Sequence, residues 1–191
     1  MSGFYAFGDH FAIDLPGARV VFATRRGGFS EGSYASLNLG KLTDDDPHAV
    51  ERNRQALTVQ IGAPMALIRQ VHGTNVIRLT APPNGTADLP EADGQATTVR
   101  GLAPLVMTAD CLPVAVAGDG AVAMLHAGWR GLAGGVLAEG VKALRELGAG
   151  DPLTAAICSG PVFPRGRRSA AVSGLPWRRS STAERAAERM S

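Results

Sequence analysis

The stretch CLPVAVAGDGAVAMLH (residues 111–126) decides the fold of this chain. Two short apolar runs flank the GDG sequence at residues 118–120, and an Asp-Gly pair between such runs is a strong signal for a β-hairpin. Because side chains alternate between the two faces of a strand, Val122, Met124 and His126 are predicted to share one face. His126 then lies where an apolar strand ends, a position from which a sheet presents side chains to a ligand.

Further elements are predicted on both sides of this hairpin. Asp46 and Pro47 are typical of a helix start, and Gly62 is typical of a helix end. A second helix is predicted over residues 132–147, with Gly148 as its stop. Short apolar runs predict additional strands at residues 18–24, 66–71, 75–79 and 104–110. Strands with two helices predict an α+β or mixed α/β fold, in which helices cover a sheet.

The composition excludes several classes of protein. With 45% apolar and 19% charged residues over 191 positions, the chain is too apolar to be disordered and long enough for one domain with a core. It has no apolar run of the roughly 18 to 20 residues that span a bilayer, and its N-terminus lacks the layout of a secretory signal. Two cysteines do not make a disulfide framework. We expect a cytoplasmic protein with reduced thiols and no membrane partner.

The net charge of +2 is unevenly distributed. Residues 1–151 carry 12 Lys or Arg and 15 Asp or Glu, whereas residues 152–191 carry 7 Arg and only 2 Glu. The basic character therefore belongs to the C-terminal segment. It does not predict nucleic-acid binding by the body of the chain.

Three residues suited to metal or nucleophilic chemistry are predicted at strand ends. They are His72, Cys111 and His126, and two imidazoles with a thiolate suit zinc, with a fourth position left for water or substrate. Their spacings of 39 and 15 residues are unlike the close ligand pairs of a zinc finger. A Cys–His nucleophile pair, in which Cys111 attacks and Asp93 or Asp110 orients the base, therefore remains an alternative.

The other two histidines lack such a context. His48 falls in the first turn of a polar helix and is expected at the surface. His10 falls in an N-terminal segment that has no predicted tether. By contrast, Arg25 and Arg130 lie in glycine-rich turns, where backbone amides and a guanidinium can bind an anion such as phosphate.

Six segments together resemble the YfiH-like family, also described as the multicopper polyphenol oxidase (laccase) or peptidoglycan editing factor family. The resemblance runs from about residue 20 to about residue 157 and rests on these motifs in this order: TRRGGFSEGSYASLNLG (24–40), NRQAL (53–57), IRQVHGTNV (68–76), EADGQAT (91–97), TADCLPVAV (108–116) and HAGWRGLAGGV (126–136). It implies a mixed α/β sandwich. It also implies a zinc site made by His72, Cys111 and His126.

The resemblance further implies an enzyme. Members of this family are described as purine nucleoside phosphorylases, which convert adenosine, inosine or guanosine with phosphate into the base and ribose 1-phosphate. Adenosine deaminase activity is expected beside this reaction, because zinc deaminases use a metal-activated water. Methylthioadenosine phosphorylase activity is expected as well. We expect substrate binding by Arg25, Asn38, Gln70 and Arg130, and proton transfer by Asp93 or Asp110.

Two other functions compete with the phosphorylase. Two His and one Cys also suit copper, as in a polyphenol oxidase, but the 4 histidines of the chain are too few for a multicopper centre. A cysteine hydrolase or amidase that edits peptidoglycan precursors would need a free, nucleophilic Cys111.

The C-terminal segment departs from the family. The family continues after Ile157 with a glycine- and proline-rich motif that Cys158 and the following residues do not match. We therefore expect one YfiH-like domain over residues 1–157, followed by an atypical basic tail over 158–191 that is frame-shifted or disordered, and we assign Cys158 no role.

Overall fold

Three β-sheets and three α-helices build the chain in a computed structural model, which describes residues 3–82 and 89–158. The first sheet is antiparallel, in the order β1-β2-β3, and comprises Tyr5–Phe7, His10–Leu15 and Ala18–Phe22. The main sheet has the order β10-β8-β9-β6-β5 and comprises Gly150–Ile157, Leu112–Asp119, Ala121–Ala127, Gly94–Thr97 and Val76–Leu79. The third sheet pairs β4 (Met65–Ala66) with β7 (Ala103–Pro104) in parallel.

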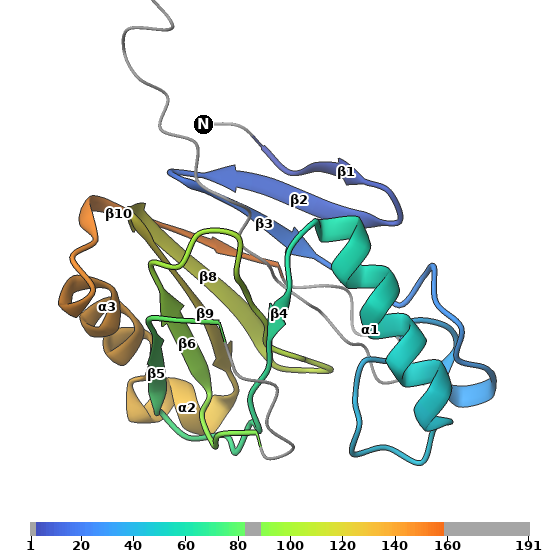
Figure 1. Ribbon diagram of the computed structural model, residues 1–191. Coiled ribbons are helices and arrows are strands. Elements are labelled where there is room, and N and C mark those ends of the chain that lie inside the picture. Colours follow the sequence, from blue (N-terminus) through green and yellow to red (C-terminus); the bar gives the residue numbers. More distant parts are fainter. Residues whose placement is uncertain (1–2, 83–88, 159–191) are drawn as a thin grey trace, which may run out of the picture.

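The helices lie outside these sheets (Figure 1). They are α1 (Pro47–Ile61), α2 (Trp129–Gly134) and α3 (Val136–Glu146), and a short 3-10 turn covers Gly32–Tyr34. None of the helices in the described residues is both long enough and apolar enough to cross a bilayer.

The predicted hairpin forms the centre of the main sheet. Strands β8 and β9 pair antiparallel from Leu112 opposite Ala127 to Gly118 opposite Ala121. Gly120 makes the turn with a φ of 85°, a backbone conformation that favours glycine. This register places the start of β8 beside the end of β9.

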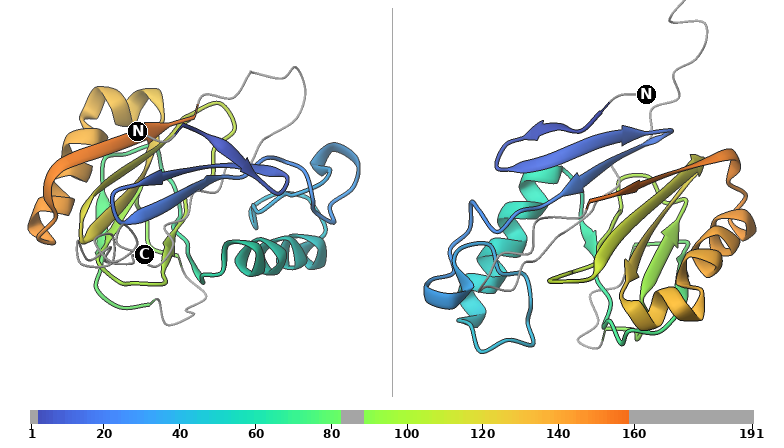
Figure 2. Two further views of the ribbon diagram at one scale, coloured as in Figure 1. Left: turned by 90° about the horizontal axis from the view of Figure 1, so that it is seen from above. Right: turned by 180° about the vertical axis from the view of Figure 1, so that it is seen from behind.

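The two faces of the hairpin enter different cores, as the alternation predicts. Val122 and Met124 pack toward β2 and β3, in one cluster with Val20 and Phe22. The opposite face, with Ala123 and Leu125, packs against α3. The first sheet, the main sheet and α2–α3 are therefore successive layers, as the views in Figure 2 show.

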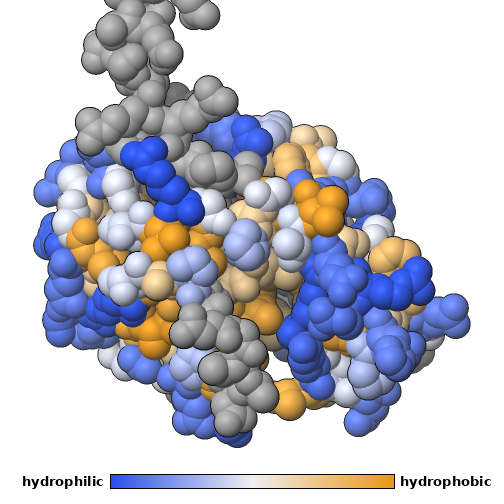
Figure 3. Space-filling model, in the orientation of Figure 1, coloured by the Kyte–Doolittle hydropathy of each residue, from blue (hydrophilic) through white to orange (hydrophobic). Residues whose placement is uncertain are grey.

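Helix α1 packs on the other side of the first sheet and confirms the predicted boundaries. The Asp46 carboxylate accepts a hydrogen bond from the His48 backbone N–H at 3.0 Å, and Gly62 ends the helix with a φ of 70°. Leu57 and Ile61 share a core with Val21 from β3. On the face drawn in Figure 3, hydrophilic residues predominate over α1, and hydrophobic residues gather over the sheets.

Three sequence-based boundaries are corrected by the structure. The helix predicted over 132–147 begins at Trp129 and is broken into α2 and α3 at Gly135, whose φ of 96° does not fit a continuous helix. The strands predicted over 66–71 and 104–110 end at Ala66 and Pro104. Beyond those ends, the Gln70 side chain joins the two segments where backbone hydrogen bonds between paired strands were expected. Its amide N–H donates to the Met107 carbonyl and its amide oxygen accepts the Met107 N–H, each at 2.7 Å.

The N-terminal segment is also more ordered than its sequence indicated. It forms the hairpin β1–β2, turned at Gly8 with a φ of 58°. Residues 83–88 lie outside the described part of the chain, and so does the predicted basic tail from residue 159 onward.

Candidate metal centre

The structure brings His72, Cys111 and His126 together at one end of the main sheet. Their ligand atoms all lie within 4.8 Å of one another, and Cys111 Sγ is 3.9 Å from His72 Nε2. Cys111 directly precedes β8 and His126 lies near the end of β9, so the hairpin register makes them neighbours. His72 comes from the turn before β5.

The three side chains differ in exposure. His126 is buried, with 3% of its surface accessible, whereas Cys111 is half-buried and His72 is exposed. The two imidazole rings are 4.8 Å apart at 77° to each other. The group is thus buried at His126 and open to solvent at His72, where a substrate atom can approach.

These residues fit a bound metal ion. Ligands at 2.0–2.3 Å from a tetrahedral zinc lie roughly 3.3 to 3.8 Å apart, close to the observed Cys111–His72 separation. Gly128 keeps the space open, because a Cβ there would lie 3.0 Å from His72 Cδ2 and 3.1 Å from Cys111 Sγ. Two imidazoles and one thiolate are also a ligand set that zinc prefers.

The environment of Cys111 does not favour a free thiolate. Burial raises the pKa of the Cys111 thiol, and the nearby carboxylates of Asp110 and Asp93 raise it further. A nucleophilic cysteine needs the opposite shift, toward a lower pKa. A metal ion displaces the thiol proton directly, so a raised thiol pKa is compatible with Cys111 as a metal ligand.

Asp93 lies beneath the group and is fully buried. Its carboxylate accepts the backbone N–H groups of Val71, His72 and Gly73 at 3.3, 2.9 and 2.6 Å. It also lies 2.8 Å from His126 Nδ1, and the backbone N–H of His126 donates to the Asp93 carbonyl at 2.7 Å. Asp110, the other predicted carboxylate, is exposed beside Cys111.

Three of the four predicted substrate-binding residues make contacts within the protein. Arg25 donates to the carbonyls of Ala35 and Ser33, at 2.5 and 3.5 Å. The Asn38 amide donates to Thr43 and Asp45 at 2.9 Å each. Gln70, as described, bonds the Met107 backbone.

Arg130 differs from these three. It is exposed, and its guanidinium lies 4.8 Å from the centre of the Trp129 ring. Trp129 is itself 70% exposed. The two side chains follow directly after Gly128, where an added Cβ would meet His72 and Cys111.

The remaining histidines lie elsewhere. His48 is exposed, as predicted. The expectation for His10 is wrong, because this residue lies in β2, is 97% buried and accepts the Thr24 N–H at Nδ1. Burial lowers the pKa of His10, and contacts with Gln60 and Asp9 oppose this shift.

Sequence reasoning missed two residues that shape the loop over residues 28–45. The Asn53 amide donates to Ser30 and to the Asn38 carbonyl at 2.8 Å each, and it accepts the Phe29 N–H at 2.7 Å. Arg54, which is buried, donates to the Leu39 carbonyl. Both occupy positions on the apolar stripe of α1, and polar residues at core positions of a helix are the signal that could have identified them.

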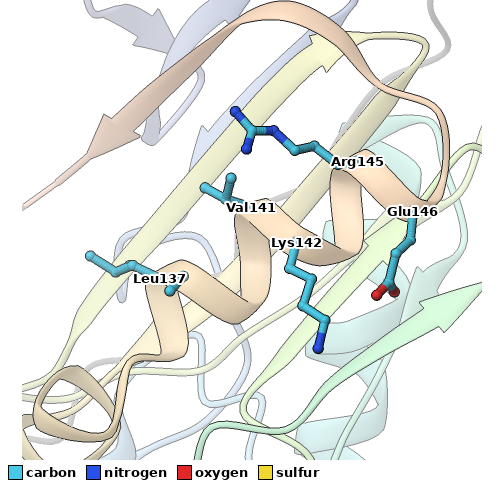
Figure 4. Close-up of a pocket in the computed structure, with 6 residues that line it drawn as sticks. Leu137, Val141, Lys142, Arg145 and Glu146 are labelled. Atoms are coloured by element: carbon cyan, nitrogen blue, oxygen red, sulfur yellow. The ribbon is translucent and has the colours of Figure 1, made fainter.

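A separate hollow of about 560 Å³ lies on the outer face of α3 (Figure 4). It is lined by Leu137, Ala138, Val141, Lys142, Arg145 and Glu146. These side chains offer neither a histidine nor a cysteine. Within residues 3–82 and 89–158, the group of His, Cys and carboxylate side chains placed to hold a metal ion is the one formed by His72, Cys111 and His126.

Comparison with known proteins assigns a family to this arrangement. Residues 19–166 match the family model described as multi-copper polyphenol oxidoreductase laccase. The chain belongs to this family. The match continues nine residues past residue 157, where the motif-based resemblance ends. It confirms the family predicted from the motifs.

Relatives with functional names are found in several bacteria. A protein of Streptomyces coelicolor named purine nucleoside phosphorylase is 42% identical over 151 residues, covering 76% of this chain and 62% of that protein. The protein of Escherichia coli named purine nucleoside phosphorylase YfiH is 40% identical, covering 68% of this chain and 54% of that protein. The chain thus spans between about half and two thirds of the length of these relatives.

Solved structures confirm the mixed α/β fold. YlmD from Geobacillus stearothermophilus matches with a TM-score of 0.74 at 30% identity, covering 82% of this chain and 64% of that protein. The Neisseria meningitidis protein NMB0706 matches with a TM-score of 0.68 at 39% identity, covering 78% and 62%.

Proposed function

We propose that this protein is a zinc-dependent purine nucleoside phosphorylase, which converts adenosine, inosine or guanosine with phosphate into the base and ribose 1-phosphate. The observation that carries the proposal is the convergence of His72, Cys111 and His126 within 4.8 Å, open to solvent on one side. Relatives about 40% identical that are named purine nucleoside phosphorylase support the substrate class.

The three residues would hold the metal ion. When bound, zinc supplies a Lewis acid that polarises a substrate oxygen or nitrogen. The 3.9 Å separation of Cys111 Sγ and His72 Nε2 also fits a Cys–His pair, and the zinc content of the purified protein distinguishes the metal centre from a cysteine hydrolase at the same place. Copper remains a second metal that this ligand set accepts, and metal analysis of the purified protein distinguishes the two.

The residues around the group suit binding of phosphate and transfer of a proton. Arg130 is exposed and lies two residues after Gly128, and a guanidinium binds phosphate bidentately. Asp110 is exposed next to Cys111, so its carboxylate is accessible to a substrate proton. Arg25 and Asn38 bond within the loop after β3, Gln70 bonds Met107, and we propose that these three residues act on the substrate chiefly through the shape of the segments they hold.

Phosphate dependence is the test of this function. The purified protein is incubated with inosine in the presence and absence of phosphate, and the release of hypoxanthine is measured. We expect release only with phosphate, and we expect the Cys111→Ser protein to lose both activity and bound zinc. Equal release without phosphate would show a hydrolase instead. No release by a folded, zinc-loaded protein would overturn the proposed activity.

Adenosine and methylthioadenosine extend the same assay. We propose that the site phosphorolyses both and also deaminates adenosine to inosine. Chromatographic separation of adenine, inosine and hypoxanthine from one adenosine incubation tells these reactions apart.

A further inference from the structure

Asp93 contacts both histidines of the metal-ligand group, which consists of His72, Cys111 and His126. It contacts one histidine at the histidine's side chain and the other at the histidine's backbone. It reaches His126 through the imidazole, at 2.8 Å from Nδ1. It reaches His72 through the backbone, because the consecutive N–H groups of Val71, His72 and Gly73 all point at its two oxygens. Consecutive backbone N–H groups that converge in this way form an anion-binding nest, and here the anion is a side chain of the same protein.

We propose that Asp93 is a positioning residue that sets both histidines for metal binding, and that it does not carry a substrate proton. This inference rests on the metal centre of the proposed function and assigns a role within it. Asp93 is fully buried, its oxygens accept three backbone N–H groups, and one of these oxygens also lies 2.8 Å from His126 Nδ1. A residue that exchanges protons with a substrate needs an accessible oxygen, which Asp110 has and Asp93 lacks.

The contact with His126 fixes the tautomer of that ring. The carboxylate receives three backbone donors, so it serves as the acceptor toward Nδ1 as well. The proton of the neutral ring therefore lies on Nδ1, and the lone pair of Nε2 is left for a metal ion. A histidine ligand whose other nitrogen donates to a carboxylate is a recurrent arrangement in metal proteins, and it sets the orientation of the ring.

The contact with the turn fixes the backbone of His72. Its φ of 62° lies in the left-handed region and makes His72 the only non-glycine residue with positive φ in the described part of the chain. This conformation is unfavourable for a residue with a Cβ and persists only when neighbouring contacts impose it. The nest around Asp93 supplies those contacts, and the resulting turn brings His72 Nε2 to 3.9 Å from Cys111 Sγ.

The first test compares the zinc affinity of Asp93→Asn with that of Asp110→Asn, by competition with a chromophoric chelator. Both variants remove one negative charge near Cys111, but only the first removes contacts with the ligands. We expect Asp93→Asn to weaken zinc binding about 10- to 100-fold, and Asp110→Asn to weaken it much less. An equal loss of zinc affinity in both variants would show that Asp93 contributes only its negative charge, and it would overturn the proposal.

A spectroscopic measurement separates positioning from general loss of structure. Cobalt(II) replaces zinc, and its visible absorption reports the geometry of the ligands. We expect a folded Asp93→Asn protein to show an altered cobalt spectrum, while Asp110→Asn retains that of the unmodified protein. An unchanged spectrum in Asp93→Asn would contradict the role.

The unmodified protein provides a test that needs no variant. In the metal-free protein, long-range ¹H–¹⁵N correlation of the imidazole nitrogens should show a proton on His126 Nδ1, the nitrogen that faces Asp93. A bare Nδ1 would overturn the inference even if Asp93→Asn fails to fold. If the unmodified protein binds no metal at all, the metal centre of the proposed function fails instead, so the two failures are distinguishable.

Discussion

Gly128 determines, at the scale of a single residue, whether the metal-ligand group has room for an ion. Its φ of −70° and ψ of 161° are open to any residue, so the backbone does not require glycine. The requirement is space, because a Cβ would lie 3.0 Å from His72 Cδ2 and 3.1 Å from Cys111 Sγ. We therefore expect Gly128→Ala to weaken zinc binding about tenfold, which corresponds to about 1.4 kcal/mol.

Isothermal titration with zinc checks this expectation at the residue scale. Gly3→Ala is the matched control, since a Cβ at Gly3 meets no atom within 4 Å. Both variants should retain the circular dichroism spectrum of the unmodified protein. Unchanged zinc affinity in Gly128→Ala would place the ion elsewhere than among these three side chains.

At the scale of an element, the loop after β3 depends on Arg25. Its guanidinium donates to the carbonyls of Ala35 and Ser33 across the loop, and its own carbonyl accepts the N–H groups of Ser36 and Leu37. We expect Arg25→Ala to lower stability by about 1 to 2 kcal/mol and Tm by about 3 to 6 °C. Arg25→Lys should recover only part of this loss, because an ammonium lacks the planar fork.

Thermal unfolding and phosphate kinetics, measured on the same Arg25 variants, distinguish a bracing role from direct substrate binding. A bracing residue lowers Tm and leaves the KM for phosphate nearly unchanged. An increase in that KM at unchanged Tm would instead make Arg25 a phosphate ligand, as its glycine-rich turn first suggested.

At the scale of the whole molecule, a metal ion would join segments that are far apart in the sequence. Residues 72, 111 and 126 come from a turn, the position just before β8 and the last part of β9, so an ion that binds only the folded chain opposes its unfolding. With zinc at about 100 times its Kd, we expect a stabilisation of about 2.7 kcal/mol and a rise in Tm of about 5 to 10 °C.

Differential scanning fluorimetry with and without zinc measures this stabilisation. Cys111→Ser is the control, because it removes one ligand with little change in volume, and its Tm should not respond to zinc. An equal rise in both proteins would show that zinc binds outside this group.

The sequence by itself determined the elements whose signals are local. The Asp-Gly turn predicted the β8–β9 hairpin, Asp46 and Gly62 predicted the ends of α1, and alternation predicted the shared face of Val122 and Met124. Each of these depends on residues a few positions apart, so side-chain chemistry and backbone preference suffice to fix them. The motifs also identified the family and singled out His72, Cys111 and His126.

Only the tertiary structure decided which polar side chains serve the site and which serve the fold. The sequence offered Asp93 and Asp110 as equivalent carboxylates, but the pairing of β6 with β9 buries Asp93 against His126 and leaves Asp110 exposed. It likewise could not show that Gln70 bonds Met107, 37 positions away. Such contacts join segments distant along the chain, and they exist only once the strands are paired, so no local pattern in the sequence encodes them.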